Sequence, residues 1–146
     1  MISAALCASA LQASLRAFST TTPLPAPLLQ RLSQSLWTGS AGDLYAHLFC
    51  GLIEPTSGRL VYAAGGSLGA ILLSDADWES LLKPSLALGI DPELRYPFEE
   101  RFMLPGQSLV VVSDGVRMET GSYGTGGRVT YAEFLKPETW QRAVDE

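Results

Sequence analysis

Histidine and cysteine are scarce in this sequence. Its 146 residues include one histidine, His47, and two cysteines, Cys7 and Cys50. One histidine excludes a histidine-rich metal centre, and two cysteines in apolar stretches do not make a disulfide framework. We therefore predict two reduced thiols in the core of a cytoplasmic protein. His47 alternates with Tyr45 and Phe49 on a predicted strand, and we expect it to be structural.

Charged residues and long apolar runs are also few. Charged residues make up 17% of the chain, apolar residues 47%, and the net charge is −5. This balance is typical of a globular domain, and nucleic-acid binding would need a basic surface instead. The longest apolar run, near Leu68–Leu73, is far shorter than the roughly 18–20 residues that span a membrane. We expect neither a nucleic-acid nor a membrane partner, and a single domain over residues 1–146.

The amino-terminal segment contains no acidic residue before Asp43. An acid-poor start that is rich in alanine and serine and contains Arg16 fits an organellar transit peptide. It also fits a helix over Ile2–Phe18 with one apolar face. We favour a buried helix, because its many alanines would let it approach a sheet closely.

The rest of the chain predicts hairpin-connected strands between helices. A second helix is predicted over Ala26–Leu36, with Pro27 in its first turn. The predicted strands are Leu44–Ile53, Arg59–Ala64, Ala70–Leu73, Tyr96–Met103 and Ser108–Ser113, the last two paired through a turn at Pro105-Gly106. Asp75–Pro84 is predicted to be a polar connection, and Ala132–Val144 a final helix. This order indicates the α+β class, with antiparallel sheets covered by helices.

The most informative segment is Gln107–Val116, QSLVVVSDGV, in which a buried strand runs into a carboxylate. Asp114 would lie at the carboxyl end of this strand, with Ser113 and Gly115 shaping the turn. A carboxylate held on the rim of a sheet is a common metal ligand or catalytic acid. The residues alone leave a second interpretation open, in which Asp114 only caps a following helix or shapes the turn.

Two blocks around this segment resemble a known family. Residues 54–63 read EPTSGRLVYA, and residues 104–116 read LPGQSLVVVSDGV. Both blocks resemble the SpoIIE/RsbU branch of the metal-dependent protein phosphatases (PPM, protein phosphatase 2C). In that branch the first block leads into an "aGh" turn, and the second block supplies a metal-binding aspartate before a glycine. The resemblance extends from about Ser3 to about Tyr123.

The resemblance implies both a fold and a chemistry. The fold would be an αββα sandwich, with two antiparallel sheets flanked by helices and a metal site at one end. The site would hold two Mn²⁺ or Mg²⁺ ions, with Asp114 as one ligand, and a metal-bound water would attack phosphorus. Gly115 would permit the turn that aims Asp114, and Arg117 is the candidate phosphate contact. The implied substrate is phosphoserine or phosphothreonine on a regulatory protein, such as an anti-anti-sigma factor, in the bacterial cytoplasm.

The sequence departs from the family pattern in three places. It has no "gDv.GhG" loop and no "DDiT" strand, and Ser67 stands where the family has the histidine of its "AGH" turn. Three explanations stay open: an incomplete phosphatase domain, a degenerate non-catalytic domain that binds a signalling regulator, or the same scaffold with another function. A missing first hairpin would expose a sheet edge, so we also expect homodimers or aggregates.

Overall fold

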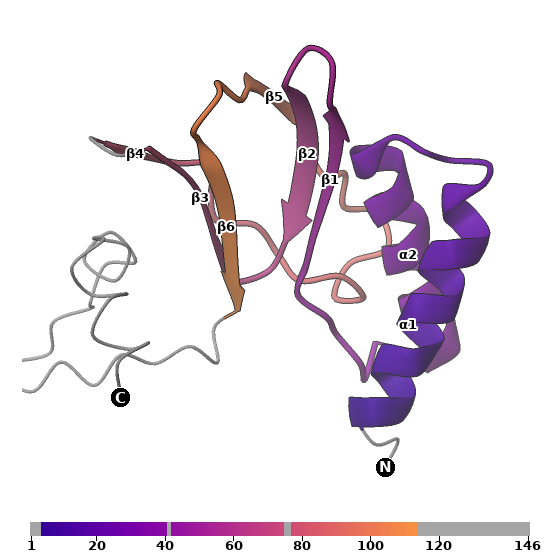
Figure 1. Cartoon of the computed structure of the whole chain (residues 1–146). Helices are drawn as coiled ribbons and strands as arrows, with labels where there is room; N and C mark the ends of the chain where they lie inside the picture. Colours follow the sequence, from indigo (N-terminus) through magenta and orange to yellow (C-terminus); the bar gives the residue numbers. More distant parts are fainter. Residues whose placement is uncertain (1–3, 41, 75–76, 114–146) are drawn as a thin grey trace, which may run out of the picture.

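The computed structural model describes residues 4–40, 42–74 and 77–113 (Figure 1). Two helices come first, and six strands follow. The helices are α1 (Ala4–Ser19) and α2 (Pro25–Ser40), and the strands are β1 (Leu48–Glu54), β2 (Arg59–Gly65), β3 (Leu68–Leu73), β4 (Trp78–Ser80), β5 (Glu99–Phe102) and β6 (Ser108–Ser113). Within these ranges, no helix is long and apolar enough to cross a membrane.

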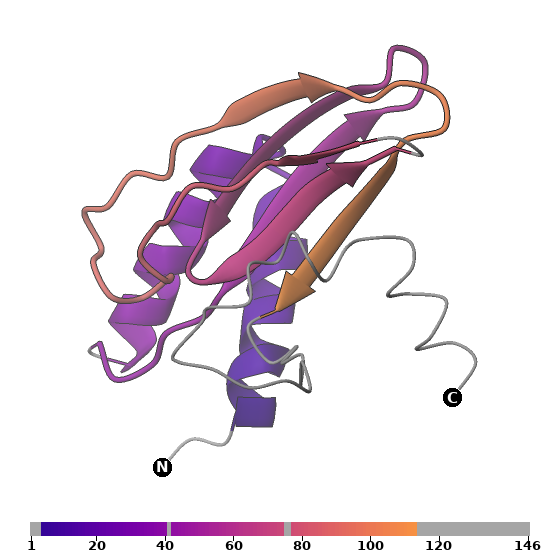
Figure 2. The same ribbon diagram turned by 90° about the vertical axis from the view of Figure 1, so that its left-hand side faces the viewer.

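The strands form two three-stranded sheets that pack face to face. The first sheet has the order β1-β2-β5 and the second the order β4-β3-β6, and every pairing is antiparallel. Figure 1 shows both helices on one side of the first sheet and the second sheet on its other side, and Figure 2 shows the two sheets from the side of the second. This arrangement confirms the predicted α+β fold. The predicted final helix, Ala132–Val144, lies outside the described residues.

Strand β2 is buried on both of its faces because it lies between the two core clusters. Tyr62 and Leu60 face the second sheet, and Ala63 faces the helices. The cluster under the helices contains Leu28, Leu29, Leu32, Ala63, Leu88 and Tyr96, and the cluster between the sheets contains Leu60, Tyr62, Ala70, Leu72 and Leu81. A strand covered on both sides is apolar along its length rather than alternating.

The prediction that the last two strands pair with each other is wrong. β5 pairs with β2, with Arg59 opposite Phe102, while β6 pairs with β3, with Ile71 opposite Val110. Pro105-Gly106 therefore carries the chain from one sheet to the other. Side-chain compatibility explains this choice, because the valines of β6 face apolar partners on β3 whereas the charged residues of β5 find counter-ions.

Five other expectations also need correction. Strand β1 begins at Leu48 rather than Leu44, because Ala46 forms an isolated bridge with Leu88. β3 is two residues longer than predicted, and β4 forms within the segment that was predicted to be a connection. α1 is helical, but none of its described residues is buried, because it packs mainly on α2 rather than on a sheet. Both cysteines are free and partly buried, and only Cys50 packs against a core cluster.

The two buried tyrosines, Tyr62 and Tyr96, predict a loss of stability in alkali. Burial raises the pKa of both phenols above the ordinary value of about 10. The unfolded chain releases these protons near that pH and the folded chain does not. The free energy of unfolding should therefore hold below about pH 10 and fall as the pH rises further.

Urea unfolding between about pH 8 and pH 11, a range that brackets the ordinary tyrosine pKa, measures how far the free energy of unfolding falls. The double variant Tyr62→Phe/Tyr96→Phe removes both phenolic protons while keeping both rings. We expect a shallower fall for this variant than for the natural chain. An equal fall in both proteins would show that other groups control alkaline unfolding.

Candidate functional site

The end of the sandwich where β6 finishes brings four strand ends together. Ser113 at the end of β6 is opposite Leu68 at the start of β3, and Gly65 at the end of β2 is opposite Leu48 at the start of β1. The arrowheads of β2 and β6 point to this same end in Figure 1. Both sheets therefore contribute backbone to one rim, and Ser113 is on it.

A tight turn and the imidazole of His47 form the described part of this rim. Gly66 joins β2 to β3 with φ of 93°, and a Cβ at this position would lie 2.8 Å from Cγ of His47. Only glycine accommodates both the left-handed backbone and the ring beneath it. The backbone N–H of Ser67 donates to Nδ1 of His47 at 3.0 Å. The carbonyl oxygen of Ser67 lies 3.2 Å from the same Nδ1 atom, so the backbone of Ser67 contacts the ring through both of its polar groups.

This contact agrees with the structural role predicted for His47, and it adds a feature that the sequence did not reveal. Ser67 occupies the position where the family has a histidine, and His47 brings an imidazole to the same turn from another part of the chain. The ring of Tyr45 lies beside it, with 5.9 Å between the ring centroids. The two contacts fix the ring against the rim. The 20-residue separation between His47 and Ser67 leaves no local pattern that could predict their contact.

The predicted site residues fall at the boundary of the described chain. Ser113 is the last described residue, and it is exposed at the end of β6. Its neighbour Val112 is buried and holds the strand end in place. Asp114, Gly115 and Arg117 lie outside the described residues, so their predicted roles stay predictions.

The described residues do not by themselves form a two-ion metal centre. Within residues 4–40, 42–74 and 77–113, no group of three or more histidine, cysteine, aspartate or glutamate side chains could hold a metal ion. The imidazole of His47 already uses Nδ1 to accept a hydrogen bond from Ser67. Divalent ions such as Mn²⁺ and Mg²⁺ need several oxygen ligands. A metal site at this rim would therefore need ligands from outside the described residues.

Two arginines that might have bound phosphate are instead paired with carboxylates at the opposite edge of the sandwich. Arg59 donates to Glu100 at 2.9 Å, and Arg101 donates to Glu79 at 2.9 Å. The second pair links β5 of the first sheet to β4 of the second sheet and so ties the two sheets together. The hydrogen bond from Lys83 lowers the pKa of Glu99, and the hydrogen bond from Arg59 lowers that of Glu100.

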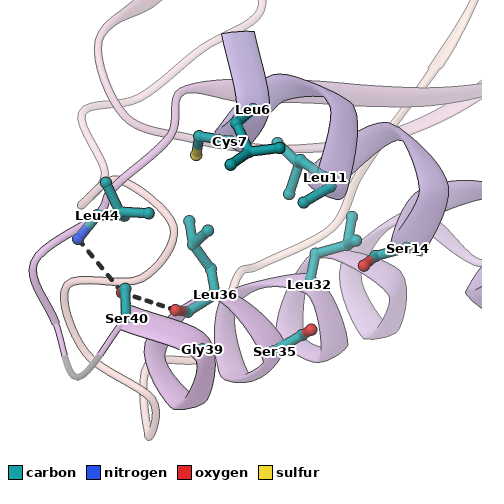
Figure 3. A pocket seen from close by; sticks show the side chains of 11 residues that line it. Leu6, Cys7, Leu11, Ser14, Leu32, Ser35, Leu36, Gly39, Ser40 and Leu44 are labelled. Atoms are coloured by element: carbon teal, nitrogen blue, oxygen red, sulfur yellow. Dashed lines mark hydrogen bonds between the residues drawn. The ribbon is translucent and has the colours of Figure 1, made fainter. Parts of the chain in front are cut away.

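A separate apolar cleft lies between α1 and α2, on the helical side of the first sheet (Figure 3). Its volume is about 330 Å³, and no charged residue lines it. The hydroxyl of Ser40 closes one end, donating to the carbonyl of Leu36 at 2.8 Å and accepting from the N–H of Leu44 at 3.3 Å. The described lining consists of leucines, one alanine, one glycine, the thiol of Cys7 and serine hydroxyls, so it includes no carboxylate, imidazole or cationic side chain.

Comparisons with known proteins agree with the fold and identify the family. The sequence matches the family model described as Stage II sporulation protein E (SpoIIE) over residues 2–144. The chain therefore belongs to the SpoIIE family, within the PPM-type phosphatases that the sequence blocks resemble. No curated protein sequence matches the chain.

One solved structure with a similar fold is a crystal structure of a bacterial serine phosphatase variant. The two structures have a TM-score of 0.57 and 13% sequence identity. The match covers 83% of this chain and 50% of the other, so this chain spans about half the length of that phosphatase. At this level of identity the likeness concerns the fold.

Proposed function

We propose that this chain is a phosphatase domain that acts on phosphoserine or phosphothreonine of a regulatory protein, with Mn²⁺ or Mg²⁺ as cofactor. The observation that carries the proposal is the position of Ser113, because β6 brings this residue, which precedes Asp114 in the sequence, to the rim formed by both sheets. Family membership over residues 2–144 supports the same activity. A phosphorylated anti-anti-sigma factor in the bacterial cytoplasm is the proposed substrate, as in the RsbU-type branch.

The proposed reaction is hydrolysis of a phosphate monoester. The oxygen of water forms a bond to phosphorus, the bond from phosphorus to the serine oxygen breaks, and that oxygen takes up a proton. The products are a serine hydroxyl and inorganic phosphate. In this proposal Asp114 is a metal ligand, Gly115 permits the turn that aims it, and Arg117 contacts the phosphate. Oxygen ligands are the type that Mn²⁺ and Mg²⁺ prefer.

Asp114→Asn is expected to abolish metal-dependent hydrolysis of a phosphoserine peptide. The amide keeps the shape of the carboxylate but removes its negative charge. The affinity of a site for a divalent ion depends strongly on the charge of its ligands. Released phosphate is measured with and without Mn²⁺ for the natural chain, for Asp114→Asn and for Glu93→Gln. Glu93 is an exposed carboxylate in the described part of the chain, so its variant should retain the natural rate. Equal rates for all three proteins would refute the role of Asp114.

A second function, a non-catalytic interaction domain, is favoured by two observations. The described residues hold no cluster of three metal-ligating side chains, and the family's "gDv.GhG" and "DDiT" segments do not occur in the sequence. Such a domain would bind a signalling regulator through the inherited surface. Failure of the natural chain to hydrolyse the peptide at any Mn²⁺ concentration, together with binding of the phosphorylated regulator, would establish this alternative.

A further inference from the structure

The outer edge of β1 is a sheet edge without the usual protection. All seven residues of β1 pair with β2 on one side, and none of the described residues pairs with its other side. The strand contains no proline, lysine or arginine, and its single charge, Glu54, is at its end. Among the other described edges, β4 is three residues long, and the glutamates of β5 pair with Arg59 and Lys83. The fourth edge strand, β6, also carries no charge, but it is followed directly by residues outside the described ranges. Short length and charge are the devices that keep natural sheet edges from pairing with other chains.

Exposed apolar side chains lie along the outer edge of β1 on both faces of the sheet. Leu52 is 48% exposed and Ile53 is 46% exposed. Because Cys50 packs toward the helices and Phe49 toward the second sheet, alternation places Leu52 on the helical face and Ile53 on the other. A cleft of about 370 Å³ between α1 and β1 adds Leu11, Leu15 and Leu48 to the same edge. An incoming strand would therefore gain backbone hydrogen bonds and apolar contacts together.

We propose that β1 of a second copy of this chain pairs antiparallel with this edge, about a two-fold axis through Cys50. The product is a continuous six-stranded sheet in which each β1 has a strand on both sides. The two copies use the same surface, which is how two-fold dimers form. The proposal rests on the fold alone and does not depend on phosphatase activity.

Charge and side-chain size select this arrangement. A parallel pair in register would place Glu54 beside Glu54 of the partner subunit, and like charges directly opposite are destabilising. An antiparallel pair centred on Gly51 would place Glu54 opposite the partner subunit's Leu48, beside the apolar cleft between α1 and β1. Burial of a carboxylate among apolar groups is unfavourable. Centring on Cys50 instead places Leu52 beside the partner subunit's Leu48.

The same register also suits the face toward the second sheet. Gly51 then lies opposite Phe49 of the partner subunit, and the small residue leaves room for the large ring. Glu54 extends past the end of the partner's strand, where water can solvate it. Each contact occurs twice because of the two-fold symmetry, so a single substitution in β1 alters the interface at two places.

Leu52→Lys tests the surface, with Phe102→Lys as a matched control. Phe102 is on β5, at the other edge of the same sheet, and is 59% exposed. Sedimentation equilibrium should show the natural chain moving from 15.6 kDa toward twice that mass as concentration rises. Leu52→Lys should weaken dimerisation by at least about tenfold, since two buried leucines are lost, and Phe102→Lys should dimerise like the natural chain. A natural chain that keeps the single-chain mass, or equal behaviour of the two variants, overturns the proposal.

Two further measurements test the register and the occupant. In a Cys7→Ser background, diamide should oxidise Cys50 and the partner subunit's Cys50 to one disulfide, each thiol giving up one hydrogen to the oxidant. Reaction of Cys50 with a small disulfide reagent in dilute, single-chain samples shows that the thiol is accessible. A dimer that does not cross-link then rules out the Cys50 register. Hydrogen exchange of the β1 amides should slow as the dimer forms, and full protection at single-chain concentrations would mean that another segment of this chain covers the edge.

Discussion

Gly89→Ala is expected to lower the free energy of unfolding by about 2–5 kcal/mol. Gly89 has φ of 85°, a left-handed conformation that costs other residues roughly 1–2 kcal/mol. A Cβ there would lie 2.5 Å from the backbone oxygen of Leu44 and 2.9 Å from Cδ2 of Leu36. The backbone oxygen has little freedom to move, so forcing this contact should add about 1–3 kcal/mol, as overpacking does elsewhere.

The matched control for this prediction is Gly106→Ala. Gly106 has nearly the same φ, 86°, but no atom lies within 4 Å of its added Cβ. This variant should lose only the backbone contribution, about 1–2 kcal/mol. Urea unfolding followed by circular dichroism gives both values, and their difference isolates the steric contact at Gly89. Equal losses in the two variants would contradict the close approach of Gly89 to Leu44.

Gly89 also shows why part of the core could not be predicted from the sequence. Its N–H donates to the hydroxyl of Ser33 at 3.0 Å, and the hydroxyl of Tyr96 donates to the same oxygen at 3.3 Å. These residues are 56 and 63 positions away from Ser33 along the chain. Ser33 is fully buried, although it is polar and lies next to the apolar stripe of α2. No local pattern distinguishes a serine with distant partners from a serine that faces water.

Local signals predicted the rest of this region well. The second helix was predicted over Ala26–Leu36, and its leucines Leu28, Leu29 and Leu32 form an apolar stripe that is buried under the sheet. The predicted strands Leu44–Ile53 and Arg59–Ala64 do form a hairpin, β1 with β2, because they are adjacent in sequence. The pairing of the last two strands failed, because a proline-glycine turn fits both a hairpin and a crossing between sheets.

The same limit applies to the candidate site. The sequence correctly predicted a strand over Ser108–Ser113, since its valines form an apolar run. It gave no indication that His47 would accept a hydrogen bond from Ser67, because the contact depends on the pairing of β1 with β2. The sequence motif therefore indicated the strand that ends at Ser113 on the rim. The position of the His47 imidazole at the rim became apparent only from the fold.

Tyr62→Ala is expected to be at least as damaging as Gly89→Ala, with a loss of about 3–5 kcal/mol. The side chain is only 1% exposed and lies at the centre of the cluster between the sheets. Its ring stacks on Phe49 with 5.7 Å between the centroids, and its hydroxyl donates to the carbonyl of Leu81 at 3.0 Å. Alanine would leave a cavity between the sheets and remove the partner of a buried carbonyl. For a domain of ordinary stability, about 5–15 kcal/mol, this is a large share.

Tyr62→Phe separates the two contributions, since it keeps the ring and deletes only the hydroxyl. It should cost about 1 kcal/mol, the usual value for one buried hydrogen bond, and unfolding in urea gives both variants on one scale. A similar loss for alanine and phenylalanine would mean that the hydrogen bond to Leu81, rather than packing, holds the sheets together. The distinction matters for the rim, because Gly65 and Ser113 are on different sheets and Tyr62 helps to fix one sheet against the other. If packing dominates, the aromatic ring between the sheets holds Gly65 and Ser113 in their relative positions at the rim. A site that includes Asp114 would then depend on this ring.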